Sequence, residues 1–164
     1  MTFIDAVKTT ILKKYATFEG RASRSEYWWF YLFYALTQIL STIIFFTFSS
    51  ESFEKYVGYT YLGYNPVELI IAIILFFPFL SVSIRRLHDS GKSGWWLLSP
   101  LVVVIIFGLL SYILVTIGLD LGDFAYFMFL IPMMLVVLYL FYLMLKKSDD
   151  GENKYGHNAC LIVK

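Results

Sequence analysis

Four long stretches without a charged side chain constrain the fold of this chain more than any other feature. They cover residues 27–50, 69–84, 93–119 and 124–145. An α-helix rises about 1.5 Å per residue, so it needs about 20 apolar residues to cross a hydrocarbon core of about 30 Å. Apolar runs of this length have few uses in a soluble domain. The sequence therefore predicts four transmembrane helices.

The composition also favours a membrane protein over a soluble globular protein. Apolar residues make up 59% of the chain and charged residues only 15%, whereas charged residues are about a quarter of a soluble protein. The shortest uncharged stretch would cover only about 24 Å as a helix. The preceding "NPVE" extends it, because Asn65 can cap a helix and Pro66 suits its first position. We expect spans at about 27–50, 66–84, 94–119 and 124–145.

The basic residues are distributed unequally between the connections, which predicts the orientation. Twelve of the 13 lysines and arginines precede the first span, separate the second from the third, or follow the fourth. The other side has Lys55 against the acidic residues Glu51, Glu54, Glu68, Asp120 and Asp123. Connections rich in Lys and Arg stay in the cytoplasm. Both termini and the loop between spans two and three are therefore predicted to be cytoplasmic.

Residues 1–17 precede the first span and show helical periodicity. Apolar side chains recur at spacings of three and four with polar side chains opposite, and Thr2 with Asp5 can cap such a helix. The pattern fits an amphipathic helix in the membrane interface, and it fits equally a helix packed on the protein's own cytoplasmic surface. Lysines interrupt the segment, so it does not read as a signal peptide.

The predicted fold class is therefore all-α. We expect an integral membrane protein with four transmembrane helices arranged as two hairpins, an N-terminal amphipathic interfacial helix, and both termini cytoplasmic. The chain reads as one membrane domain over residues 1–164, ending in a cytoplasmic tail at 146–164. Within this tail, Asn153, Tyr155 and Gly156 are predicted to form a turn that docks on the loop between spans two and three.

That loop, "RRLHDSGKSGWWLL" at residues 85–98, contains the main candidate site. Its "GKS" is not a P-loop, because the P-loop glycine would have to stand where this chain has Arg86. Basic side chains of the loop and of the segment before the first span could bind an anion such as a lipid phosphate. The candidates for this anion or headgroup site are Arg21, Arg24, Arg85, Arg86, His88 and Lys92.

The competing interpretation is a structural network that locks the two hairpins together, with Arg85 paired to Asp89 one turn later. Ion-pair networks gather the same residue types as anion sites, so the pattern alone leaves both interpretations open. The candidate members of the structural network are Glu26, Trp28, Asp89, Trp95, Trp96, Asn153, Tyr155 and Gly156.

The reactive residues do not form a recognisable catalytic or metal site. His88 and Asp89 are adjacent, so on a helix they point about 100° apart, which is poor geometry for a base and its orienting carboxylate. His157 and Cys160 have a spacing that metal sites use, but two ligands do not complete a zinc site. The four uncharged stretches also lack the ionisable residues of ion-coupled transporters. We expect no metal, no cofactor and no enzymatic activity.

Three motifs resemble a known family. They are "FEGRASRSEYWWF", "RRLHDSGKSGWW" and "GENKYG", and they are similar to the signature of the bacterial inner-membrane proteins grouped as domain-of-unknown-function family 805. The resemblance covers about residues 18–156 and implies a bacterial inner-membrane protein, without a reaction or ligand. Family tails often continue with proline after the Tyr-Gly pair, whereas this chain has "HNAC". The matching positions are Gly20, Arg21, Arg24, Trp28, Arg85, Arg86, Leu87, His88, Asp89, Gly94, Trp95, Trp96, Asn153, Tyr155 and Gly156.

The leading functional hypothesis is a non-enzymatic binding or scaffold protein. It would recognise an anionic lipid headgroup, a small ligand or a partner protein on its basic cytoplasmic face. An oligomeric channel or pore is the alternative, and it requires self-assembly through small residues such as Ala72, Gly108 and Gly118. A membrane-bound enzyme comes third. The expected partners are the lipid bilayer, including anionic phospholipid, and further copies of the chain, but no nucleic acid.

Overall fold

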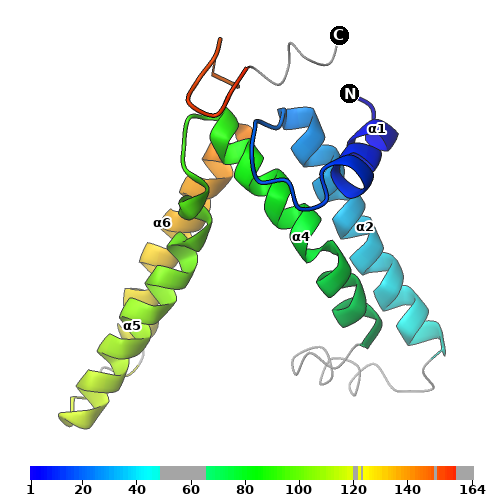
Figure 1. Cartoon of the computed structure of the whole chain (residues 1–164). Helices are drawn as coiled ribbons and strands as arrows, with labels where there is room; N and C mark the ends of the chain where they lie inside the picture. The colour runs from blue at the N-terminus through cyan, green and yellow to red at the C-terminus, as the bar shows by residue number, and fades with distance from the viewer. Residues whose placement is uncertain (49–65, 120–121, 123, 150, 158–164) are drawn as a thin grey trace.

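The computed structural model describes residues 1–48, 66–119, 122, 124–149 and 151–157. Within these residues the chain is helical and contains no β-strand. A short helix, α1 (Phe3–Lys8), continues into a π-helical turn, η1 (Thr9–Lys13), and is followed by α2 (Arg24–Phe48) and α4 (Pro66–Asp89). A 3₁₀ turn, η2 (Gly94–Leu98), leads into α5 (Ser99–Thr116), and α6 (Phe124–Leu145) is the last helix (Figure 1).

Four segments are long and apolar enough to cross a membrane, namely Arg24–Phe45, Val67–Asp89, Gly94–Thr116 and Phe127–Leu145. The prediction of an all-helical chain with four transmembrane helices is therefore confirmed. Helix α4 continues to Asp89, beyond the end of the apolar run at residue 84. It can do so because the charged side chains of its last turn, Arg85, Arg86 and Asp89, are buried among protein partners.

Helix α1 begins with the predicted cap and packs on the protein itself. Thr2 Oγ1 accepts a hydrogen bond from the Asp5 backbone at 3.3 Å, and the Asp5 carboxylate accepts one from the Thr2 backbone at 3.2 Å. The hydrogen bonds from Thr2 lower the pKa of the Asp5 carboxyl. On α2, the Trp29 ring lies 5.9 Å from that of Phe3, while Ile4 is exposed. The segment thus contacts α2 and also presents apolar surface outward.

The N-terminal segment compensates for a proline inside α4. Pro78 has no backbone N–H, so the carbonyl of Ile74, four residues earlier, lacks its helical donor. The Tyr15 hydroxyl donates to this carbonyl at 2.5 Å, and Ser81 Oγ donates to the Lys14 carbonyl at 3.1 Å. Residues 14–22 then follow α4 toward its C-terminal end. We call residues 14–22 the strap.

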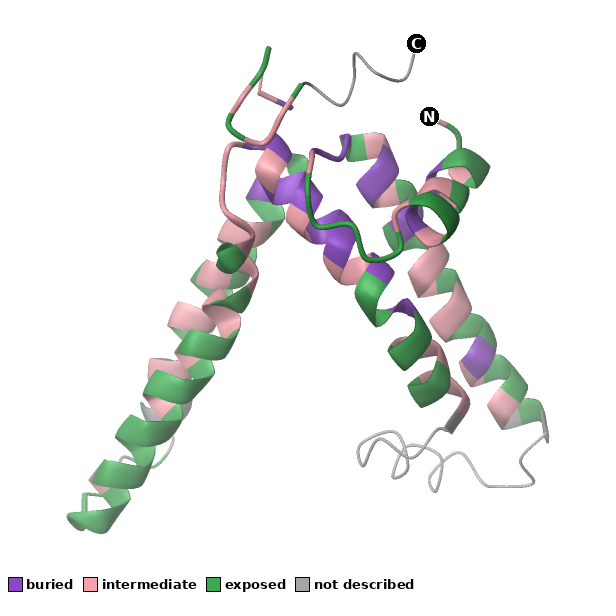
Figure 2. Cartoon of the chain, viewed as in Figure 1, coloured by how far each residue is buried: buried purple, intermediate pink, exposed green. Residues whose placement is uncertain are grey.

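Buried residues gather at the end of the molecule where α4 ends (Figure 2). The apolar part of this core joins Phe30 of α2, Val82 and Leu87 of α4, and Leu143 of α6. Helix α2 packs on α4 and α5 packs on α6, and the two pairs diverge from this shared end (Figure 1). Helix α5 has no buried residue. We call the shared end the polar end, because most of its buried residues are polar or charged.

Candidate functional site

Asp89 is the centre of the polar end. Its side chain is fully buried, and its Oδ1 accepts a hydrogen bond from Arg21 Nε at 2.9 Å. Its Oδ2 accepts from Arg86 Nη1 and from Ser148 Oγ. One carboxylate thus joins the strap, α4 and the chain that follows α6. A buried carboxylate loses its hydration, and several hydrogen bonds from charged and polar donors are needed to offset that loss.

Arg21 holds the C-terminal tail to the strap. Its guanidinium group is buried and donates to the backbone carbonyls of Asp149 at 2.7 Å, Gly151 at 2.8 Å and Gly156 at 3.3 Å. These carbonyls belong to a segment without helix or strand, where backbone acceptors need donors from elsewhere. Arg21 therefore uses its donors on the protein's own backbone as well as on Asp89.

Arg86 caps the C-terminus of α6. Its Nε donates to the Met144 carbonyl at 3.1 Å, and its Nη2 donates to the Lys146 carbonyl. The last carbonyls of a helix have no donor within the helix, and Ser90 Oγ supplies another one by donating to the Leu143 carbonyl at 3.0 Å. The end of α4 thus closes the end of α6.

Arg85 connects α4 to α2. Its Nη1 donates to Glu26 Oε1, and its backbone carbonyl accepts from the Ala22 N–H at 3.0 Å. The predicted pairing of Arg85 with Asp89 is wrong, because Glu26 pairs with Arg85 while Asp89 pairs with Arg21 and Arg86. We call Arg21, Glu26, Arg85, Arg86 and Asp89 the ion-pair cluster. Three guanidinium groups against two carboxylates leave it with one excess positive charge.

His88 connects the strap to the tail. Its ring is stacked on that of Tyr155, with centroids 3.8 Å apart and an interplanar angle of 5°. Its Nδ1 lies 3.2 Å from the Gly20 carbonyl, which can only accept, so Nδ1 carries the hydrogen. Asn153 Nδ2 donates to the His88 carbonyl at 3.0 Å, and Asn153 forms a backbone bridge with Gly156. The tail turn therefore lies against the end of α4.

The remaining predicted residues lie outside these contacts. Arg24 is exposed at the start of α2, and Lys92 is half-exposed. Trp28 is half-buried against α6, and the Trp96 ring also packs on α6. Trp95 is 77% exposed. The predicted basic residues thus divide into a buried group of Arg21, Arg85 and Arg86, a part-buried His88, and a surface group of Arg24 and Lys92.

Two glycines allow neighbouring segments to approach the end of α4. Gly91 has a φ of +73°, and a Cβ atom there would lie 2.7 Å from Asp149 Oδ2. At Gly94 a Cβ atom would lie 2.8 Å from Ile84 Cγ2. At Gly91 the positive φ favours glycine, and a side chain there would turn the Asp149 carboxylate aside. A side chain at Gly94 would require η2 or Ile84 to shift.

Sequence reasoning missed the residues that follow α6. Ser148 and the carbonyls of Lys146, Asp149 and Gly151 all bind the ion-pair cluster, and Lys146 Nζ pairs with the Asp149 carboxylate at 3.0 Å. These residues belong to a short polar run, "KKSDDG", which reads as a solvated exit from a membrane helix. Backbone carbonyls leave no signal in a sequence, so their partners could not be found there.

A cleft beside the ion-pair cluster combines one cation with apolar walls. Its volume is about 430 Å³, and its lining residues come from the first turns of α2 and the end of α6: Arg24, Ser25, Trp28, Trp29, Leu32 and Leu145. We call it the Arg24 cleft. Among the described residues, no three His, Cys, Asp or Glu side chains are grouped to hold a metal ion, and Cys160 lies outside the described residues.

Comparisons with known proteins place these motifs in one family. The family described as "Protein of unknown function (DUF805)" matches residues 15–157. Inner membrane protein YhaH of Escherichia coli (strain K12) is 40% identical over 93 residues, which are 56% of this chain and 69% of the relative. Inner membrane protein YhaI of the same strain is 35% identical over 89 residues, 54% of this chain and 65% of the relative.

A third relative extends the similarity over most of the chain. Uncharacterized protein YiiR of Escherichia coli (strain K12) is 26% identical over 156 residues, which are 92% of this chain and 90% of the relative. No solved structure matches the chain. The family match covers the strap, all four long helices and the tail turn. The relatives of this chain include inner membrane proteins of Escherichia coli, and the chain belongs to the DUF805 family.

Proposed function

We propose that this protein is a non-enzymatic lipid-binding protein of the inner membrane, which recognises an anionic phospholipid headgroup at its polar end. The observation that carries the proposal is the Arg24 cleft, where an exposed guanidinium group stands beside two tryptophans and two leucines. A phospholipid has the same division into an anionic group and apolar chains. The cleft therefore matches the ligand in charge and in polarity.

Each part of the Arg24 cleft has a counterpart in such a lipid. A guanidinium group can bind a phosphate through two parallel hydrogen bonds, and Ser25 beside it offers a hydroxyl donor. Tryptophan rings prefer the level of the lipid headgroups. Leu32 and Leu145 are exposed and lie in the same cleft, where acyl chains can cover them.

The buried arginines have a different role in this proposal. Arg21, Arg85 and Arg86 donate to Asp89, to Glu26 and to backbone carbonyls, so they brace the polar end rather than bind lipid. Of the six basic residues predicted for the anion site, Arg24 is the one that combines exposure with a lined cleft. The ion-pair cluster then holds α2 and α6 in place on either side of the ligand.

The lipid proposal is tested by the thermal stability of the purified protein in neutral detergent, with and without phosphatidylglycerol. The wild-type melting temperature should rise with phosphatidylglycerol, and Arg24→Gln should lose most of this rise while keeping the melting temperature in neutral detergent. Lys154→Gln removes another exposed cation and should keep the full rise. The proposal is contradicted if phosphatidylglycerol raises the melting temperature of Arg24→Gln as much as that of the wild type. It is also contradicted if phosphatidylglycerol does not change the melting temperature of the wild type.

The proposal also orients the chain with its polar end in the cytoplasm, as the distribution of Lys and Arg indicates. Leu119 and Lys154 are both exposed and belong to opposite ends of the spans. In a Cys160→Ser background, Leu119→Cys should react with an impermeant thiol reagent in intact cells, and Lys154→Cys should react only after permeabilisation. The reverse labelling pattern contradicts the orientation.

A further inference from the structure

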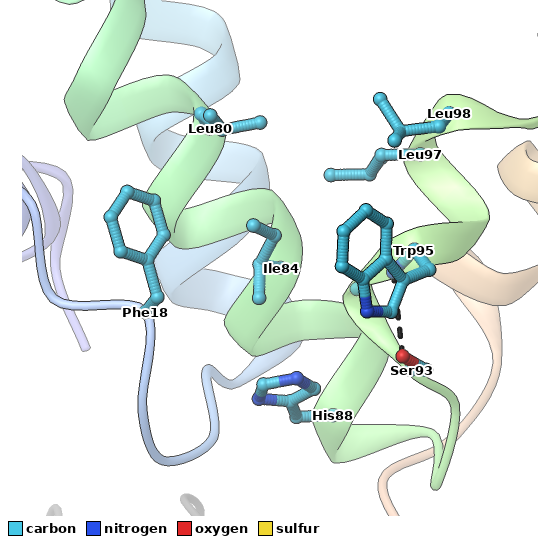
Figure 3. A pocket seen from close by; sticks show the side chains of 9 residues that line it. Phe18, Leu80, Ile84, His88, Ser93, Trp95, Leu97 and Leu98 are labelled. Carbon is cyan, nitrogen blue, oxygen red and sulfur yellow. Dashed lines mark hydrogen bonds between the residues drawn. The ribbon is translucent and has the colours of Figure 1, made fainter.

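A second cavity lies beside the last turns of α4, whereas the Arg24 cleft is lined by α2 and α6. It is open on one side, has a volume of about 320 Å³, and is lined by the last turns of α4, by η2 and by the strap residue Phe18 (Figure 3). This volume is at the lower end of the range of small-molecule pockets, about 300–1,000 Å³. The cavity shares no lining residue with the Arg24 cleft. We call it the strap cavity.

The strap cavity is apolar except at one end. Its walls include Leu80 and Ile84 of α4 and Leu97 and Leu98 of η2. The polar groups of the lining are the His88 ring, the Ser93 hydroxyl and the indole N–H of Trp95, and His88 and Ser93 lie at the end opposite Leu80 and Leu98 (Figure 3). Among the described residues, no Lys, Arg, Asp or Glu lines the cavity. Its shape and polarity therefore suit a hydrocarbon chain with one small polar group at its end.

The hydrogen-bonding groups at this end further define the ligand. Because His88 Nδ1 donates to the Gly20 carbonyl, Nε2 of the neutral ring is an acceptor. Ser93 Oγ accepts from the backbone N–H of Trp95 at 3.4 Å, and the hydroxyl hydrogen of Ser93 remains a donor. A hydroxyl group can donate to the first and accept from the second. A carboxylate cannot donate, and its charge would have no counterion in the lining.

The position of the strap cavity indicates where its ligand comes from. Phe18 and Trp95 on its rim are 37% and 77% exposed, and the cavity lies between two helical segments that are apolar enough to cross a membrane. Its rim is thus within reach of lipid chains in the bilayer. A protein partner would have to compete with those chains for the same apolar surface.

We infer that the strap cavity binds a neutral, hydroxyl-ended hydrocarbon chain drawn from the bilayer, with the hydroxyl group at His88 and Ser93. This site goes beyond the proposed headgroup function, because it involves other residues and a ligand without charge. Gly94 contributes to the shape of the strap cavity. Its missing side chain lets η2 approach Ile84, so Trp95 and Leu97 line the same cavity as Leu80 and Ile84 of α4.

The experiment is photolabelling of the full chain in phosphatidylcholine nanodiscs with an n-decanol analogue that carries a diazirine on its chain. Labelled peptides are identified by mass spectrometry. The label should appear within residues 80–98 and on Phe18, it should saturate, and unlabelled n-decanol should compete with it. Decanoate should compete at least about fivefold more weakly, the effect of one lost hydrogen bond between neutral groups.

Three variants sharpen the experiment. Leu80→Trp fills the strap cavity and should abolish the saturable label, whereas Leu69→Trp adds the same ring to an exposed position of the same helix and should label like the wild type. Ser93→Ala removes the hydroxyl donor and should weaken competition by n-decanol about fivefold. Melting temperatures establish that each variant is folded.

Several results would overturn the inference. These are a label that does not saturate or is spread over exposed positions of all four long helices, equal competition by decanoate, and wild-type labelling of Leu80→Trp. Arg24→Gln should label like the wild type, because Arg24 does not line the strap cavity. Failure of the headgroup proposal and failure of this inference are therefore distinguishable.

Discussion

The two helix pairs of this protein are held together in different ways. Helix α4 carries buried residues from Leu75 to Asp89 and is fastened to α2, the strap and the tail by ion pairs and hydrogen bonds. Helix α5 has no buried residue, and α6 buries only Leu143 and Met144 among its described residues, both near its end. The first pair is a folded body along much of its length, whereas the second is anchored at one end.

This difference shows where the fold of a small membrane protein obtains its specificity. Lipid tails are as apolar as leucine side chains, so apolar helices gain little from exchanging lipid for each other. Charged groups in an apolar environment are costly without partners, and a matched arrangement is favoured over others. The ion-pair cluster therefore determines which segments are neighbours at the polar end. The apolar helices extend from that end and add little specificity of their own.

The largest effect is expected at Asp89. Asp89→Asn removes the charge between Arg21 and Arg86, so two buried guanidinium groups lose the carboxylate that they share, which should cost about 3–5 kcal/mol of unfolding free energy. The loss should be equal with and without phosphatidylglycerol, measured by unfolding in mixed detergent micelles. Glu19→Gln, at an exposed strap position, is the control. Near wild-type stability of Asp89→Asn would mean that the two helix pairs do not depend on the cluster.

A second prediction compares the two helix pairs directly. Phe30→Ala on α2 empties a fully buried site and should lower the unfolding free energy by about 3 kcal/mol. Leu109→Ala on α5 truncates a side chain that is 59% exposed and should change it by no more than about 0.5 kcal/mol. Equal losses in the same unfolding assay would mean that α5 is packed against another surface.

The junction between the two pairs should respond less strongly. Gly94→Ala places a Cβ atom against Ile84, so η2 or Ile84 must shift, at an expected cost of about 1–3 kcal/mol. Gly108→Ala is the matched control, because no atom lies within 4 Å of a Cβ built there. Hydrogen exchange should report faster exchange in residues 94–98 of Gly94→Ala only. If exchange in residues 94–98 is unchanged, the structure of η2 does not depend on its close packing against α4.

The smallest effect is expected at the proline of α4. Tyr15→Phe leaves the Ile74 carbonyl without the donor that replaces the missing N–H of Pro78, which should cost about 1 kcal/mol. The same substitution at the exposed Tyr112 of α5 should have no effect. If Pro78→Ala makes Tyr15→Phe neutral in a double-mutant cycle, the hydroxyl acts through that carbonyl, and an unchanged cost would contradict this.

The four spans could be predicted from the sequence because hydropathy and length are local properties. The partners of the charged residues could not be predicted in the same way. Arg21 is 68 residues from its partner Asp89 and Glu26 is 59 residues from its partner Arg85. The spacing of Arg85 and Asp89 suggested a pair that the structure replaces with other ion pairs. Burial decided the outcome, since three of six candidate anion ligands are buried and each donates to a group inside the protein. The sequence motifs identified the segments that meet at the polar end, but they did not identify which charged residues pair there.

The contacts of Arg21 have a consequence for how the protein is made. Arg21 belongs to a part of the chain that is synthesised early, but three of its acceptors, the carbonyls of Asp149, Gly151 and Gly156, are synthesised more than a hundred residues later. Until those residues leave the ribosome, the early segments have a guanidinium group without its full set of acceptors. Final closure of the polar end therefore waits until the residues after α6 have been synthesised, and a chain interrupted before residue 149 carries an unfinished surface that quality-control proteases can recognise.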